Sequence, residues 1–166
     1  RTEFLECKAG QRGAVLSDWV RSANVKGAAT VLVMPADQYQ MFQVDRPEVE
    51  EHELASALQW KVKDMIDYEL DDAVIGGFEF PKEASKGRNI VTAVCAKKVI
   101  VKGYVDLALA AGLELQSIHI TELALRNVLV QLDPVEGSKA ILYLRKGAGI
   151  LVFCKDDVLY FSRRTN

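Results

Sequence analysis

The order of hydrophobic patterns between Gln38 and Ile120 restricts the possible folds of this chain most strongly. Strands carry apolar residues in continuous runs or at every second position, whereas amphipathic helices carry them at spacings of three and four. By these criteria the segment predicts, in order, a strand, a helix, two strands, a helix and a strand: Gln38–Asp45, Glu50–Tyr68, Ala73–Phe80, Asn89–Ala96, Lys98–Ala111 and Leu113–Ile120. This is the βαββαβ order of a ferredoxin-like unit, in which both helices are expected to cover one face of the sheet.

Further elements flank this βαββαβ unit on both sides. Before it, Val15–Ser22 has helical spacing, and Ala28–Pro35 is the apolar run of a buried strand, which we expect to pair with Gln38–Asp45 as a hairpin. After it, Thr121 caps a third helix, and Ile141–Arg164 predicts three short strands joined by turns. We therefore expect an α/β protein in which the βαββαβ unit is inserted into a larger fold.

The predicted division of the chain follows from this order. Residues 1–36 are expected to belong to a first subdomain, 37–120 to the inserted βαββαβ subdomain, and 121–166 to a helix and the start of a second subdomain. The sequence opens on Arg1 without a methionine and stops at Asn166 directly after a predicted strand. We therefore expect a fragment of a longer protein.

Charge and composition argue against several classes of protein. The net charge of -2 supplies no basic excess for neutralising phosphates, so a nucleic-acid-binding protein is not expected. No apolar run approaches the length of a membrane-spanning helix. Cys7, Cys95 and Cys154 are far apart and include no C-x-x-C pair, which favours reduced thiols in a cytosolic protein over disulfides or a zinc site.

The titratable residues predict no catalytic or metal-binding arrangement. His52 lies between Glu51 and Glu53 in an acidic helix start, but the zinc-binding pattern H-E-x-x-H is absent. His119 lies between two isoleucines of a predicted strand, where a partly buried structural role is expected. The acidic residues between 64 and 72 follow no calcium-loop spacing and indicate a helix end with a solvated turn.

The turn at Arg145–Gly149, between the first two closing strands, contains two cations and two glycines. It has two possible interpretations. Backbone amides and cations of such a turn can wrap a phosphate, but glycines are equally common in hairpins that bind nothing.

Trp60 also has two possible interpretations. In the predicted long helix it lies off the main apolar stripe, near the edge of the face that should meet solvent. Either a further layer of protein covers it, or it is an exposed aromatic anchor for a partner, because large aromatic side chains dominate the energetics of interfaces.

Residues 31–80 resemble a known family. The shared features are a strand that ends at a proline, a second strand that ends near Pro47, an acid-rich helix start, then Leu54, Ala57 and Trp60, and a short acidic turn into a strand. In these features the chain resembles the PilM family of type IV pilus assembly proteins, and the resemblance extends over Ala28–Arg164. Within the family it is most similar to the MshI group of MSHA pilus biogenesis proteins. The cytoplasmic domain of the type II secretion protein GspL is a related alternative.

The resemblance implies an actin-like (RNase H-like) fold with an inserted subdomain similar to that of the bacterial division protein FtsA. PilM-like proteins lie on the cytoplasmic face of the inner membrane and bind the cytoplasmic tail of a PilN-like membrane protein, in a cleft beside the inserted subdomain. The same role is expected here, with an assembly ATPase as a further partner and without insertion into the membrane. The residues expected to contact the tail are Tyr39, Met41, Phe42 and Trp60.

The resemblance also bears on the glycine-bearing turn. Family members with intact motifs bind ATP and a metal ion through two phosphate hairpins, each of which carries an Asp. When the second hairpin is laid over this sequence, its Asp falls on Tyr143 and its Gly on Arg145. Gly147 and Gly149 do not restore the pattern, and Lys146 offers only a point charge. We therefore expect a degenerate phosphate hairpin, no cofactor, and a non-catalytic scaffold.

Two other functions stay open on the sequence alone. The full-length chain is an actin-like ATPase if competent residues lie outside the sequence, for example in an Asp-x-Gly hairpin before Arg1. A stand-alone ferredoxin-like module that binds a small ligand is the weaker alternative, because such a module has no use for the three strands predicted after Lys139.

Overall fold

Three small sheets and the helices that cover them make up the structure, a computed structural model that describes residues 3–132, 137–145 and 147–165. The chain divides into unit 1, which is Arg1–Leu32 with Lys98–Ile118, and unit 2, which is Val33–Lys97 with His119–Asn166. Short 3-10 helices occur within the connections: η1 (Ala9–Gln11), η2 (Ala36–Gln38), η3 (Glu51–Glu53) and η4 (Leu70–Asp72).

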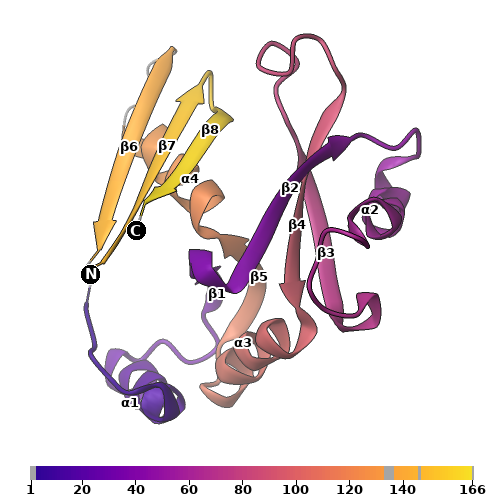
Figure 1. Ribbon diagram of the computed structural model, residues 1–166. Helices are drawn as coiled ribbons and strands as arrows, with labels where there is room; N and C mark the ends of the chain where they lie inside the picture. The colour runs from indigo at the N-terminus through magenta and orange to yellow at the C-terminus, as the bar shows by residue number, and fades with distance from the viewer. Residues whose placement is uncertain (1–2, 133–136, 146, 166) are drawn as a thin grey trace. The chain divides into compact units, whose positions relative to one another are not determined.

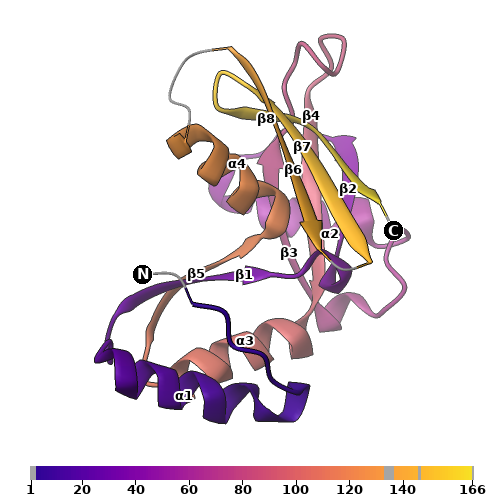
Figure 2. The same ribbon diagram turned by 90° about the vertical axis from the view of Figure 1, so that its left-hand side faces the viewer.

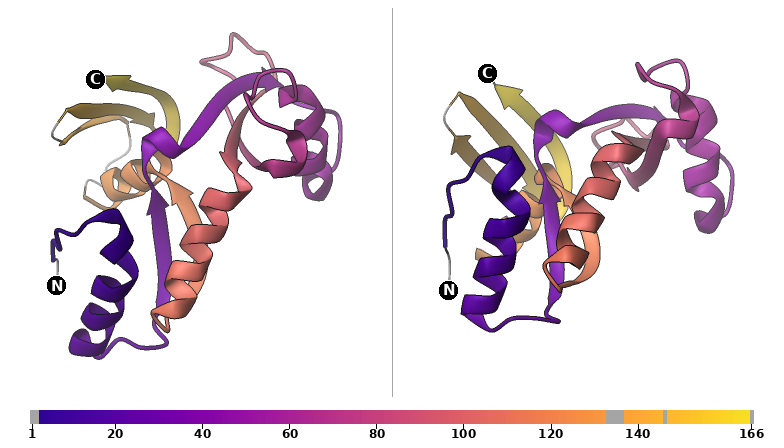
Figure 3. Two further views of the ribbon diagram at one scale, coloured as in Figure 1. Left: turned by 60° about the horizontal axis from the view of Figure 1, so that its bottom comes forward. Right: turned by 90° about the horizontal axis from the view of Figure 1, so that it is seen from below.

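Unit 1 is built on helices α1 (Arg12–Ala23) and α3 (Lys98–Ala110) and on most of strands β1 (Ala29–Met34) and β5 (Glu114–Ile120). The two strands pair with each other, and Figures 2 and 3 show both helices on one side of them. Val20, Ala108 and Leu113 are buried in the core of this unit. Gly112 follows α3 with a φ of 74°, a left-handed conformation that suits glycine, as predicted for a helix end.

The predicted hairpin of the first two strands is wrong. β1 pairs with β5, whereas β2 (Tyr39–Asp45) pairs with β4 (Ile90–Lys97). The reason lies in η2, which directly follows Pro35. A hairpin between adjacent strands requires a tight reversal of the chain, and a turn of 3-10 helix occupies that place instead.

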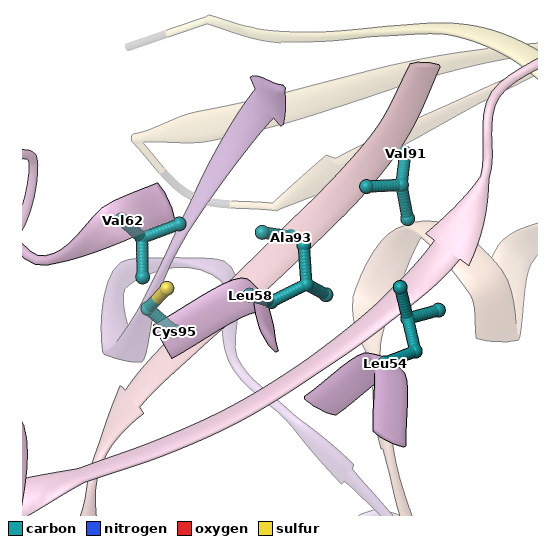
Figure 4. Packing of buried hydrophobic residues seen from close by; sticks show 6 residues of the cluster. All are labelled: Leu54, Leu58, Val62, Val91, Ala93 and Cys95. Carbon is teal, nitrogen blue, oxygen red and sulfur yellow. The ribbon is translucent and has the colours of Figure 1, made fainter. Parts of the chain in front are cut away.

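The sheet β2–β4–β3 and helix α2 (Leu54–Val62) form one part of unit 2, and β3 spans Ala73–Glu79 (Figure 1). Both strand pairs of this sheet are antiparallel. Figure 4 shows the buried cluster that joins the helix to β4: Leu54, Leu58, Val62, Val91, Ala93 and Cys95. Gly77 of β3 is required for this packing, because a Cβ atom there would lie 2.6 Å from Leu58 Cδ1.

Helix α2 is shorter than the predicted Glu50–Tyr68. It follows η3, and it ends at Val62, whose carbonyl oxygen accepts backbone hydrogen bonds from Met65 at 2.9 Å and from Ile66 at 3.3 Å. This shared acceptor tightens the last turn. Ile66 then packs against the core that α2 forms with the sheet, so hydrophobic contact is kept although the helix has ended.

The predicted βαββαβ sheet is also wrong, although the order of the elements along the chain is confirmed. Only β2, β3 and β4 form this sheet, because β5 pairs with β1. Helix α3 is in unit 1, where Ala108 and Ala111 share a core with Val20 of α1. The predicted division of the chain at residues 36 and 120 stays a prediction.

The last three strands form the antiparallel meander that the sequence predicts: β6 (Ser138–Arg145), β7 (Ala148–Lys155) and β8 (Val158–Thr165), in the order β6–β7–β8. Figure 2 shows helix α4 (Thr121–Leu132) along one face of this sheet. Ile150, Val152 and Cys154 of β7 are buried there, and Leu123 and Leu129 of α4 pack against them. None of the helices in the described ranges has both the length and the hydropathy that crossing a membrane requires.

Candidate functional site

The ionisable side chains of the described residues gather into no potential metal site. Among residues 3–132, 137–145 and 147–165, no three His, Cys, Asp or Glu side chains come together as potential metal ligands. Cys7, Cys95 and Cys154 are free thiols, and the last two are buried. Burial raises the pKa of Cys95 to about 11, so this thiol is protonated at neutral pH, the form that does not act as a nucleophile.

The turn between β6 and β7 borders a pocket of about 510 Å³, which we call the hairpin pocket. Its lining includes Asp37, Thr121, Tyr143, Arg145, Gly149 and Arg164. Three residues of the predicted degenerate phosphate hairpin, Tyr143, Arg145 and Gly149, are thus brought together. Gly147 is in the turn itself, and Lys146 lies outside the described residues.

Both glycines of this turn have an explanation that involves no phosphate. Gly147 has a φ of 77°, which a non-glycine residue adopts only with strain. A Cβ atom on Gly149 would lie 2.7 Å from Thr165 Oγ1 and 3.0 Å from Leu144 Cδ2, so both side chains would have to shift to accommodate one. The glycines therefore serve the turn and the packing of the sheet.

Glu122, in the first turn of α4, is fully buried beside this pocket, and both of its carboxylate oxygens are paired. Arg164 Nε donates a hydrogen bond to Oε1 at 2.9 Å, and the Tyr39 hydroxyl donates one to Oε2. The Arg164 guanidinium also donates to the Ala36 carbonyl oxygen, and its Cζ atom lies 4.7 Å from the centre of the Tyr39 ring. Burial and the bond to Glu122 raise the pKa of Tyr39 to about 12. We call Glu122, Arg164 and Tyr39 the buried polar network.

The residues around the hairpin pocket do not fit the magnesium–nucleotide complex that the family resemblance implies. Magnesium requires several oxygen ligands in near-octahedral geometry. Tyr143 and Arg145 stand where the Asp and the Gly are expected, and Glu122 is already paired with Arg164. Of the described residues that line the pocket, Asp37 is the only carboxylate. We therefore assign this pocket no step of phosphoryl transfer.

A second hollow, of about 480 Å³, lies between the β2–β4–β3 sheet and strand β8, and we call it the β8 groove. Its lining is largely apolar and includes Met41, Gln43, Phe78, Thr92, Leu159 and Phe161. Phe42, Phe80, Tyr160 and Ser162 complete it. Two of the predicted partner contacts, Met41 and Phe42, therefore border the same groove.

Side-chain alternation places the β8 groove and α2 on opposite faces of the β2–β4–β3 sheet. Phe42 and Val44 pack against the core beneath α2. Met41 and Gln43 alternate with them and point to the other face, where the register sets Gln43 opposite Thr92. Phe42 thus belongs mainly to the core, whereas Met41 belongs to the groove.

The predicted contact residues do not share one surface. Tyr39 is only 4% exposed and its hydroxyl is held by Glu122, so it is not available as the surface contact that the sequence predicted. Trp60 is 74% exposed, which agrees with one of its two interpretations. Because α2 covers the face opposite the groove, the structure does not bring Trp60 together with Met41.

Sequence patterns did not reveal the buried polar network or the β8 wall of the groove. An acidic residue in the first turn of a helix normally interacts with the helix dipole in solvent, and Glu122 fits that simpler description. In the structure, Arg164 lies opposite the buried Ile150 in the ladder, so its side chain starts from the face of the sheet that packs against α4.

No family model matches the sequence, and no curated protein matches it significantly. Among solved structures, a chain of the PilM–PilN type IV pilus biogenesis complex matches with a TM-score of 0.76 and 15% identity, over 99% of this chain and 50% of that chain. This chain therefore shares the fold of that chain. The mixed α/β, actin-like fold class predicted from the sequence is therefore confirmed.

A second solved structure has a similar fold. The cytoplasmic domain of EpsL, an inner-membrane component of the type II secretion system of Vibrio cholerae, matches with a TM-score of 0.60 and 15% identity, over 93% of this chain and 56% of that chain. A Bacteroides thetaiotaomicron protein of unknown function, described as having an actin-like ATPase fold, matches with a TM-score of 0.45 and 12% identity, over 82% of this chain and 47% of that chain. This third similarity is too weak to support a conclusion. The chain spans about half the length of the first two structures.

Proposed function

We propose that this chain is part of a non-catalytic component of a type IV pilus assembly machine, which binds the cytoplasmic tail of a PilN-like inner-membrane protein. The observation that carries the proposal is the PilM fold, shared over 99% of the chain with a member of the PilM–PilN complex. The similarity to EpsL supports a broader role in inner-membrane assembly platforms, in which type II secretion is the related alternative.

The chemistry of unit 2 supports binding rather than catalysis. In the hairpin pocket, Tyr143 stands where the family's metal-binding Asp is expected, and Glu122 beside the pocket is paired with Arg164. The β8 groove, by contrast, offers apolar side chains, which stabilise a complex by removing apolar surface from water. Met41, Phe42 and the exposed Trp60 are the proposed contact residues.

Finer assignments extend this proposal. The residue pattern from 31 to 80 favours the MshI group, which serves MSHA pili, among PilM-like proteins. The work would take place at the cytoplasmic face of the inner membrane, where the partner's tail holds the protein. An assembly ATPase is the proposed further partner, since a scaffold without nucleotide chemistry relies on another subunit for energy.

Isothermal titration calorimetry on the full-length protein that contains this chain tests the proposal. A synthetic peptide with the tail sequence of the PilN-like protein from the same organism should bind saturably with one site per chain. A peptide of the same composition in scrambled order is the matched control and should not bind. Absence of tail binding by folded protein would contradict the proposal.

The same instrument separates the scaffold from the rival ATPase. ATP with Mg²⁺ should give no metal-dependent binding to the full-length protein, because Tyr143 stands where the metal-binding Asp is expected. Magnesium-dependent ATP binding would favour the actin-like ATPase and would place the competent residues outside this chain.

A further inference from the structure

The connection between β1 and β2, which we call the entry segment, runs from Met34 to Tyr39 and is bonded along its length to α4 and β8. The Thr121 hydroxyl donates a hydrogen bond to the Met34 carbonyl oxygen at 2.9 Å. The Arg164 guanidinium donates one to the Ala36 carbonyl oxygen. The Thr121 backbone N–H donates to the Tyr39 hydroxyl oxygen at 2.9 Å, and this hydroxyl is itself a member of the buried polar network. The segment through which the chain enters β2 is therefore fastened to the start of α4 and to β8.

The two three-stranded sheets of unit 2 have separate cores. The buried residues between α2 and the β2–β4–β3 sheet are those shown in Figure 4. The buried residues of the β6–β7–β8 sheet, against which α4 packs, are Ile150, Val152, Cys154 and Leu159. We call residues 39–97 the α2 part, and the described residues between 121 and 165 the α4 part. Because each part has its own buried core, the α2 part can move relative to the α4 part while both stay folded.

The contacts that join the α2 part to the α4 part differ in strength and in direction. Tyr39 donates to the fully buried Glu122, and a hydrogen bond to a buried charged group is stronger than one exposed to water. Tyr160 donates to the exposed Glu83 at 3.2 Å, where water competes for both groups. Phe78 packs against the core of the α4 part, but apolar contact is non-directional. The buried polar network therefore has the largest part in fixing the orientation of the α2 part.

We propose that the buried polar network is a latch, which holds the α2 part against the α4 part while it is closed. When the latch opens, the α2 part rotates as a rigid body about the entry segment. In such hinge motions a few residues of a connecting segment absorb the change in backbone angles. Opening widens the β8 groove and exposes Met41 and Thr92, on the wall of the groove that faces β8. The inference rests on contacts within unit 2 and is independent of the partner proposed above.

Thiol labelling of the full-length protein measures how often the latch opens. Thr92→Cys places a thiol of similar size on β4, at a position that borders the β8 groove and is 6% exposed. The native Cys95 lies on the same strand but in the core beneath α2, and the native Cys154 lies in the core of the α4 part. A thiol reagent is added under native conditions, and mass spectrometry of the peptides gives the labelling rate at each position. Each rate is divided by the rate in the unfolded protein.

The Thr92→Cys protein by itself separates opening from unfolding. Position 92 should be labelled at least about tenfold faster than Cys95 or Cys154, because opening leaves both cores intact. Low concentrations of urea should accelerate labelling at Cys95 more steeply than at position 92, since opening exposes less surface than unfolding does.

Two tyrosine variants of the Thr92→Cys protein distinguish the latch from the contact at the rim of the groove. Tyr39→Phe removes the hydroxyl that donates to Glu122 and keeps the ring, so labelling at position 92 should accelerate at least about tenfold. Tyr160→Phe is the matched control, because it removes the hydroxyl that donates to the exposed Glu83, and it should change this rate less than about threefold.

Three outcomes overturn the inference. Equal rates at position 92 and at Cys95, with equal dependence on urea, would show that the groove wall is exposed only by unfolding. An unchanged rate at position 92 in Tyr39→Phe would show that the network does not control opening. An equal acceleration in Tyr160→Phe would assign the control to the rim as well. The comparison within the Thr92→Cys protein decides the question even if Tyr39→Phe does not fold.

Discussion

The hairpin pocket and the β8 groove both border the β6–β7–β8 sheet, but they differ in whether their side chains are paired within the protein. Beside the hairpin pocket, the charges of Glu122 and Arg164 satisfy each other. The lining of the β8 groove is, by contrast, largely apolar. Polar groups that pair internally stabilise a fold, whereas apolar surface is available to another molecule.

The largest effect is expected from breaking the buried polar network. Glu122→Ala leaves the Arg164 guanidinium and the Tyr39 hydroxyl without their carboxylate. The Tyr39 hydroxyl is then buried without its acceptor, whereas the Arg164 side chain is 35% exposed, so urea unfolding should show a loss of about 2–3 kcal/mol. Asp37→Ala is the matched control, because Asp37 is exposed and lines the same pocket, and it should change the free energy of unfolding by less than about 0.5 kcal/mol. Equal stability of the two variants would mean that the network does not hold this region together.

Alkaline pH should weaken the same network. The pKa of Tyr39 is raised from 10.0 to about 12 by burial and by Glu122, so the folded state holds this proton more tightly than the unfolded state does. The stabilisation is therefore complete below pH 10 and is lost as the pH rises toward 12. Two pH units correspond to about 2–3 kcal/mol. Unfolding followed from pH 8 to 12 should show a shallower loss for Tyr39→Phe than for the parent, and identical slopes would contradict the assignment.

A smaller effect distinguishes packing from phosphate binding at the hairpin. Gly149→Ala should lower the free energy of unfolding by about 1–2 kcal/mol, because the new methyl group would meet Thr165 Oγ1 and Leu144 Cδ2. Adding Thr165→Ala removes the nearer of these atoms, so the double variant should recover part of the loss. If Gly149→Ala is as stable as the parent, close packing is not the reason for glycine at this position.

The smallest effect on stability is expected at Trp60, and a variant there tests whether the partner also contacts α2. Trp60→Ala should change the free energy of unfolding by less than about 0.5 kcal/mol, since the side chain is 74% exposed. Any loss of tail affinity in this variant, measured by calorimetry, therefore reports a direct contact. Such a loss would show that the partner reaches the α2 face as well as the β8 groove, and unchanged affinity would remove Trp60 from the site.

Local patterns in the sequence predicted most of the elements but not how the strands pair. The order of strands and helices, the end of α3 at Gly112 and the closing meander all depend on residues that are near each other in the chain. The pairing of β1 with β5 joins strands that are separated by nearly half of the sequence. No local period carries that information, and the short connection after Pro35 favours a hairpin with the next strand.

The candidate sites, too, were predictable from the sequence only in part. From the sequence alone, comparison with the family's motif already removed the metal-binding Asp from the hairpin, and the resemblance to the family placed Met41 among the expected contact residues. Only the tertiary structure decided that Tyr39 is buried with Glu122 and that Met41 faces β8. The physical reason is that burial of a charge and the apposition of an edge strand depend on contacts between distant segments. Arg164 contacts Glu122 only because α4 packs against the sheet that contains β8.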